Sequence, residues 1–151
     1  ADGIQFTAGQ GFLNHLTIAG NEGRGLVRSG GTCVISNSIL WANGVDTTGG
    51  VSAAWCSISN GWFTDGGNNT NIPPLFAAWP WCHLSSRAGH YTGGYFSGGS
   101  WERGTAQSPL IDAADPAAPF GLEPHPNGDG PILGHMAIHR LRRKPGDRGE
   151  R

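Results

Sequence analysis

Three short stretches in the first sixty residues share one pattern of apolar and polar positions: NHLTIAGN (14–21), NSILWANG (37–44) and WCSISNGW (55–62). Aligned on Leu16, Ser38 and Cys56, the second stretch follows the first by 22 residues (38 − 16) and the third follows the second by 18 (56 − 38). Alternation with a period of two predicts β-strands, and the recurrence predicts units that stack on one another. Two columns align in the three stretches, the first of Leu16, Ser38 and Cys56 and the second of Ile18, Leu40 and Ile58.

Glycine-rich segments separate these stretches, and the smaller apolar runs GLVRS, TCVIS and GVSAAW supply further strands. Several short strands per period of about twenty residues predict an all-β fold, a right-handed parallel β-helix (solenoid) with two to three coils over residues 1–62. Asn21 and Asn43 share a column after the strand, so we expect a turn ladder of amide hydrogen bonds. An antiparallel β-sandwich is the alternative. The columns and the lack of two-residue hairpin turns favour the coil.

The composition is typical of a turn-rich β protein, and it limits the classes of partner that we expect. The chain has 26 glycines and only 14% charged residues, and its formal net charge is −1. We therefore expect no nucleic-acid partner, and no apolar run is long enough for membrane insertion. Cys33, Cys56 and Cys82 are unevenly spaced with no CxxC pair. They are predicted to be small buried hydrophobes rather than zinc ligands or a disulfide framework.

Six motifs occur in a characteristic order: VISNSILWANG, VSAAWCSISNGW, NIPPLFAA, CHLSSRAGHY, SPLIDAADP and EPHPNGDGPILG. In this order they resemble the C-terminal region of a bacterial right-handed parallel β-helix repeat protein of the pectate-lyase-like superfamily. The resemblance spans residues from about 12 to 134. It departs from the family pattern at PPLF, where the family often has an Asp first, at Ala114, which takes a Gly position, and after residue 134.

The resemblance implies that this chain is the non-catalytic C-terminal end of an exported β-helix protein, extracellular or at the cell surface. The parent would bind or degrade polysaccharide as a polysaccharide lyase or glycoside hydrolase. The alternative is a surface-exposed structural or adhesive stalk with no catalysis. The start, ADGIQFTAGQGF, has neither Met nor a signal peptide, so we expect upstream coils. Without them, we expect self-association through the open first coil.

Residues 63–134 are rich in Trp, Pro and Gly without a clear period, which predicts an irregular C-terminal capping segment. Leu110 and Ile111 are expected to pack against the open end of the coils. Other apolar residues are expected to cover the core: Leu75, Phe76, Trp79, Trp81 and Leu84.

The densest group of carboxylates lies in the stretch SPLIDAADPAAPFGLEPHPNGDGPI (108–132), and comprises Asp112, Asp115, Glu123 and Asp129. A calcium loop needs six or more closely spaced oxygen ligands, and the DxxD spacing at 112–115 does not match one. Asp before Pro favours turn initiation, and Asp side chains bond nearby backbone N–H groups. We therefore interpret these acids as turn-makers of the cap, and predict no metal and no cofactor.

The last seventeen residues, 135–151, carry six basic and two acidic residues, whereas residues 1–134 carry four and nine. We predict a basic, disordered tail. When Gly134–Arg140 is back-translated and read in a shifted frame, permitted codons give AYGNTP, which is the ending that the family shows. One hypothesis is therefore that the tail results from a frameshift. The other is that it is an ordinary basic tail. His135 and His139 have a metal-compatible spacing, but no third ligand is evident.

No catalytic residue is predicted in this chain. The coils offer Glu22, Arg24, Arg28 and Asp46 and no Lys, and the pKa of Arg is too high for an easy general base. Flat aromatic faces suit sugar rings as well as core packing. The candidates for sugar stacking are Trp41, Trp55 and Trp62, with Trp41 favoured because it points outward if Leu40 points inward.

Overall fold

A computed structural model describes residues 1–93 and 98–118, and in these ranges the chain is all-β with no helix. No membrane-spanning helix occurs in the described part of the chain. The strands, in chain order, are β1 (Ile4–Phe6), β2 (Gln10–Asn14), β3 (Thr17–Ala19), β4 (Arg24–Arg28), β5 (Thr32–Ser36), β6 (Ile39–Trp41), β7 (Val45–Ala54), β8 (Ser57–Ile58), β9 (Gly61–Asp65), β10 (His90–Tyr91) and β11 (Trp101–Glu102).

The first nine strands pair in parallel and follow the repeat of the sequence. β1, β2 and β3 pair with β4, β5 and β6, respectively. In turn, β4 and β5 both pair with β7, and β6 pairs with β8. Ile18 pairs with Leu40, and Leu40 pairs with Ile58, which confirms the second column and its two offsets. The pairing runs beyond residue 62, because β9 lies beside β7 up to Asp65.

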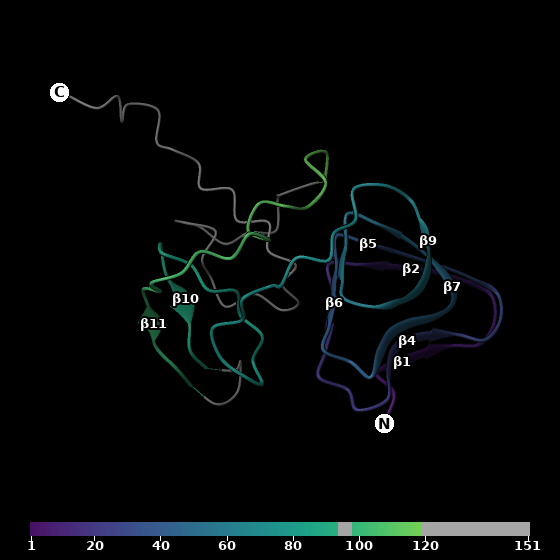
Figure 1. Ribbon diagram of the computed structural model, residues 1–151, viewed down its shortest axis with the longest axis horizontal. Helices are drawn as coiled ribbons and strands as arrows, with labels where there is room; N and C mark the ends of the chain where they lie inside the picture. Colours follow the sequence, from purple (N-terminus) through teal and green to yellow (C-terminus); the bar gives the residue numbers. More distant parts are fainter. Residues whose placement is uncertain (94–97, 119–151) are drawn as a thin grey trace.

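Two curled sheets result (Figure 1). The larger, 6-stranded sheet has the order β1-β4-β7-β5-β2, with β9 also paired to β7, and the smaller sheet has the order β3-β6-β8. The long strand β7 joins the two arms of the larger sheet, because its first half pairs with β4 and its second half pairs with β5.

The chain turns at equivalent positions in successive repeats. His15, Asn37 and Trp55 separate the larger sheet from the smaller one, and their φ angles are 55°, 48° and 55°. These left-handed conformations disfavour most side chains, yet they recur with the same offsets of 22 and 18. At the preceding corner, Gly9 and Gly31 have φ angles of 79° and 68°, and glycine adopts them without a steric penalty.

The main core lies between the two sheets and is formed by inward side chains of the parallel strands. Its buried members are Ile18, Leu26, Cys33, Ile35, Leu40, Val51, Ala53, Cys56 and Ile58. Cys33 and Cys56 are buried free thiols, as predicted, and burial raises the pKa of Cys56 to about 11. Cys82 is also a free thiol but is only partly buried.

Residues 74–93 and 98–118, here called the lateral segment, lie beside the smaller sheet (Figure 1). A second cluster joins Ile39 of β6 to Leu84 and Leu110. Ile39 and Leu40 are adjacent in one strand, so they point to opposite faces, and Leu40 belongs to the main core. The lateral segment therefore covers the outer face of the smaller sheet.

This placement corrects the expectation that Leu110 and Ile111 close the open end of the coils. They pack on the side of the stack, because Ile39 and Trp41 give β6 an apolar outer face. Of the residues expected to cover the core, Leu84 is buried and Phe76 is partly buried against the second cluster. The other three are exposed: Leu75, Trp79 and Trp81.

Hydrogen bonds complete the attachment of the lateral segment. The backbone N–H of Asp115 donates to Asn37 Oδ1 at 2.8 Å, and Asn37 Nδ2 donates to Asn14 Oδ1 at 3.0 Å. The corner residue Asn37 thus connects two repeats and the lateral segment.

Candidate functional site

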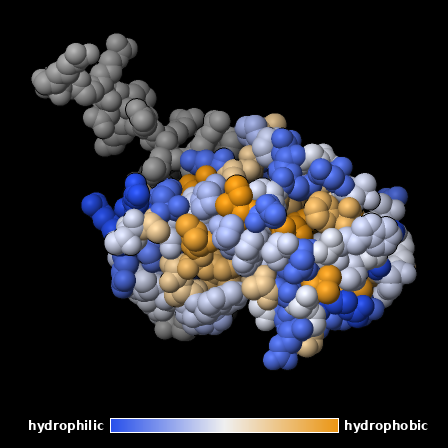
Figure 2. Space-filling view, viewed as in Figure 1, coloured by the Kyte–Doolittle hydropathy of each residue, from blue (hydrophilic) through white to orange (hydrophobic). Residues whose placement is uncertain are grey.

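Exposed large apolar side chains occur on both the strands and the lateral segment. The face in Figure 2 shows separate hydrophobic patches among hydrophilic residues. The exposed residues are Phe12, Val45, Trp62, Ile72, Leu75, Trp79, Trp81 and Trp101. Phe12 and Trp62 are the most exposed of them, with 78% and 69% of their surface accessible, and both lie on the larger sheet.

The outward side chains of β2, β5, β9 and the second half of β7 form one surface, which we call the outer sheet face. Phe12, Val34, Ser52 and Thr64 are paired neighbours across these strands. Their neighbours in sequence, including Cys33 and Val51, point into the core, so these four point outward. Four strands at about 4.8 Å spacing make a surface about 14 Å across.

Uncharged polar groups surround the exposed ring of Phe12 on the outer sheet face. Gln10 and Asn14 lie on either side of it in β2, and Thr32 and Ser36 are their partners in β5. Ser36 Oγ donates to Asn14 Oδ1 at 3.1 Å. Amides and hydroxyls both donate and accept hydrogen bonds, so this surface matches a ligand rich in hydroxyl groups.

Trp62 and Arg28 border this surface at the corner beside Gly50. A Cβ atom at Gly50 would lie 3.5 Å from Arg28 Nη2 and 3.5 Å from Trp62 Cη2. Arg28 Nε donates to the carbonyl of Gly49, and Nη1 donates to the carbonyl of Gly31. These contacts hold the guanidinium in a fixed orientation.

The three tryptophans predicted to stack on sugars lie on different parts of the molecule. Trp41 is partly buried against the second cluster, under the lateral segment. Trp55 is partly buried at a corner, with a φ angle of 55°. Trp62 is exposed on β9. Phe12 was not predicted, although its place two residues before Asn14 in an alternating strand was a usable signal.

Asn21 and Asn43 contact each other directly, and a buried carboxylate extends the contact. Asn21 Nδ2 donates to Asn43 Oδ1 at 2.8 Å, and Asn43 Nδ2 donates to Asp46 Oδ1 at 2.8 Å. Asp46 is fully buried and its Oδ2 accepts hydrogen bonds from the backbone N–H groups of Ser59 and Asn60. Asp46 is therefore part of the interior and is not presented to a substrate.

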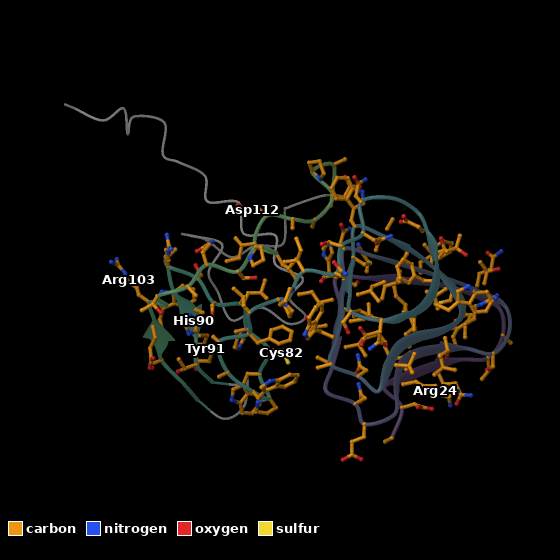
Figure 3. The ribbon with its side chains drawn as sticks, viewed as in Figure 1. Arg24, Cys82, His90, Tyr91, Arg103 and Asp112 are labelled. Atoms are coloured by element: carbon orange, nitrogen blue, oxygen red, sulfur yellow. The ribbon has the colours of Figure 1, made fainter. Side chains whose placement is uncertain are left out.

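The remaining charged candidates do not converge. Arg24 forms an ion pair with Asp2 at 2.7 Å, and its hydrogen bonds hold the pKa of Asp2 at about 2. Figure 3 shows Arg24 on the strands, whereas Asp112 lies on the lateral segment. Glu22 is exposed.

The predicted acidic cluster is described only in part. Asp115 Oδ1 accepts a hydrogen bond from the backbone N–H of Ala117 at 2.8 Å, which is the local turn bond typical of Asp. Asp112 is exposed and has a φ angle of 61°. Glu123 and Asp129 lie outside the described residues, as do His135 and His139 and the tail 135–151. Within residues 1–93 and 98–118, no group of three or more His, Cys, Asp or Glu could hold a metal ion.

Comparisons of this sequence and fold with family models, curated proteins and solved structures found no match. The function is therefore inferred from the chain's own residues, and the outer sheet face is the candidate binding site.

Proposed function

We propose that this chain is the non-catalytic end of an exported right-handed parallel β-helix protein, and that its outer sheet face binds polysaccharide. The β-helix assignment is supported by the recurring corner positions and by strands paired in parallel with offsets of 22 and 18. The exposed ring of Phe12 among uncharged polar side chains is the observation that carries the binding proposal.

The chemistry of the outer sheet face supports binding better than catalysis. Polysaccharides present apolar C–H faces and many hydroxyl groups, which match an aromatic ring and neighbouring amides and hydroxyls. General acid–base catalysis needs a titratable side chain within hydrogen-bond reach of the substrate. The outward residues of β2 and β5 include Gln10, Phe12 and Asn14, and none of these outward residues is titratable.

Binding of the full 151-residue chain to a panel of insoluble and soluble polysaccharides tests the proposal. We expect at least one polysaccharide to retain the protein, and we expect Phe12→Ser to weaken that retention. Trp81→Ala is the matched control, because Trp81 is also exposed but lies on the lateral segment. If a folded protein, verified by circular dichroism, is retained by no polysaccharide, the binding proposal is wrong and the non-binding stalk is favoured.

A further inference from the structure

Two asparagines of the repeats are each followed by glycine, in the pairs Asn43–Gly44 and Asn60–Gly61. They end equivalent stretches, ILWANG and SISNG. The carboxylate of Asp46 accepts the backbone N–H of Asn43 at Oδ1 and that of Asn60 at Oδ2, each at 3.2 Å. The two pairs therefore share a sequence and a hydrogen-bond partner, and they differ in what surrounds the asparagine side chains.

The side chain of Asn43 is buried and its hydrogen-bonding capacity is used. Asn43 is 6% exposed. Its Nδ2 donates to the carbonyl of Ile18 at 2.9 Å and to Asp46 Oδ1 at 2.8 Å. Its Oδ1 accepts from the backbone N–H of Asn21 at 3.1 Å and from Asn21 Nδ2 at 2.8 Å. Since an amide has two donors and two acceptor lone pairs, any movement of this side chain breaks hydrogen bonds.

The side chain of Asn60 is exposed and is held only by its oxygen. Oδ1 accepts the backbone N–H of Asp46 at 2.8 Å. Within residues 1–93 and 98–118, Nδ2 of Asn60 has no hydrogen-bond partner. A backbone N–H placed at a carbonyl oxygen stabilises the negative charge that develops there during nucleophilic attack. The amide of Asn60 is therefore polarised for attack, and its nitrogen is able to leave.

Gly61 supplies the attacking atom. A bond from its backbone nitrogen to Cγ of Asn60 closes a succinimide ring, and glycine has no Cβ to obstruct that nitrogen. Another residue does not fit here, because a Cβ on Gly61 would lie 2.5 Å from the carbonyl oxygen of Thr47. The φ angle of Gly61 is also positive, at 113°. The fold at the start of β9 thus requires the same glycine that makes Asn60 reactive.

We propose that Asn60–Gly61 is a site of spontaneous deamidation and that burial protects Asn43–Gly44. The backbone nitrogen of Gly61, deprotonated by hydroxide, attacks Cγ of Asn60. The Cγ–Nδ2 bond then breaks, and Nδ2 takes a proton from water and leaves as ammonia. Water opens the succinimide at either carbonyl, which gives aspartate or isoaspartate at position 60. The net change is an amide and water converted to a carboxylate and ammonium. The site does not depend on the proposed glycan binding.

Either product disturbs the contacts that Asp46 makes. The new carboxylate replaces a neutral amide beside a residue whose own carboxylate is buried, and like charges in one site repel. Isoaspartate also routes the main chain through Cβ, which adds a methylene just before Gly61 pairs with Thr47. We therefore expect deamidation to loosen β9, the strand that carries Trp62.

Peptide mapping of the full 151-residue chain during incubation at neutral and mildly alkaline pH tests the site. Chymotrypsin cleaves after tryptophan, so residues 42–55 carry Asn43 and residues 56–62 carry Asn60 in separate peptides. Mass spectrometry then measures deamidation of each peptide, and samples digested without incubation correct for deamidation during digestion.

We expect the peptide 56–62 to deamidate at least about tenfold faster than the peptide 42–55. The reason is that reaction at Asn43 first breaks several hydrogen bonds, each worth about 1 kcal/mol. The rate at Asn60 should rise with pH, because the attacking nitrogen must lose its proton. In urea, where the fold no longer protects Asn43, the two peptides should deamidate at similar rates.

Two variants test the effect on β9. Asn60→Gln keeps an amide but would have to form a larger ring, so it should keep its mass and its rate of amide exchange in β9 as the sample ages. In the unmodified chain, that exchange should become faster as Asn60 is lost. Asn60→Asp introduces the charge at once and should show faster exchange in β9 from the start.

The outcomes are distinguishable. Equal deamidation of the two peptides in the folded chain, or no deamidation of either, overturns the proposed site. This comparison needs no variant, so it decides the question even if Asn60→Gln fails to fold. Faster deamidation at Asn60 with unchanged amide exchange in β9 establishes the site and overturns the loosening of β9.

Discussion

The buried carboxylate of Asp46 connects two successive repeats. Its carboxylate is fully buried and accepts hydrogen bonds from Asn43, Ser59 and Asn60. Asp46→Asn replaces one acceptor oxygen by a donor and leaves buried N–H groups without partners. We expect the free energy of unfolding to fall by about 3 kcal/mol, measured by urea denaturation. Asp65→Asn, at the exposed end of β9, is the control, and equal losses in both variants would contradict this role.

The ion pair of Asp2 and Arg24 makes stability dependent on pH at the start of the chain. The pKa of Asp2 is about 2 in the folded protein, below its ordinary value of 3.8. Because this pKa is lowered, the ion pair stabilises the fold at pH values above 3.8, and the stabilisation is lost as the pH falls toward about 2. We therefore expect Asp2→Asn to lower the urea midpoint at neutral pH and to have a much smaller effect at pH 2, where the carboxyl of Asp2 is partly protonated. An effect that is the same at both pH values would contradict the assignment.

At the scale of the elements, the attachment of the lateral segment depends on the second cluster. Leu110 is 3% exposed and belongs to the same buried cluster as Ile39 and Leu84. Leu110→Ala should weaken the packing by about 3 kcal/mol. Trypsin should then cleave at the exposed Arg87 and Arg103 faster than in the unmodified chain, while amide exchange in β4 and β7 stays slow.

The control for this prediction is Leu75→Ala, because Leu75 is 45% exposed. It should leave the rate of cleavage nearly unchanged. Faster exchange in β4 and β7 of Leu110→Ala would mean that the lateral segment and the strands unfold as one unit, contrary to the prediction.

The sequence was sufficient to predict the strand register but not the position of the lateral segment. Ile18, Leu40 and Ile58 could be aligned because an alternating pattern with a fixed offset is local information. Ile39 beside Leu40 makes both faces of β6 apolar, and no local pattern tells which face a distant segment covers. The burial of Asp46 was missed for a similar reason, since its partners Ser59 and Asn60 are 13 and 14 residues away.

At the scale of the whole molecule, β1, β2 and β3 form an edge at which the described part of the chain pairs no further strand. Each of these strands has a parallel partner on one side, and several apolar side chains near it are only partly buried: Ile4, Phe6, Leu13 and Leu16. Unpaired strand edges favour association. We expect sedimentation to show concentration-dependent association of the chain, reduced by Leu13→Lys. A monomer at all concentrations would contradict this.

Amide chemical-shift mapping by NMR tests whether the outer sheet face binds a glycan. An oligosaccharide of a polymer that binds would be titrated into the isotope-labelled full chain. We expect the largest shifts at Thr32, Val34, Ser52 and Thr64, and small shifts in the lateral segment. Shifts confined to the lateral segment, or spread evenly over the chain, would contradict this expectation.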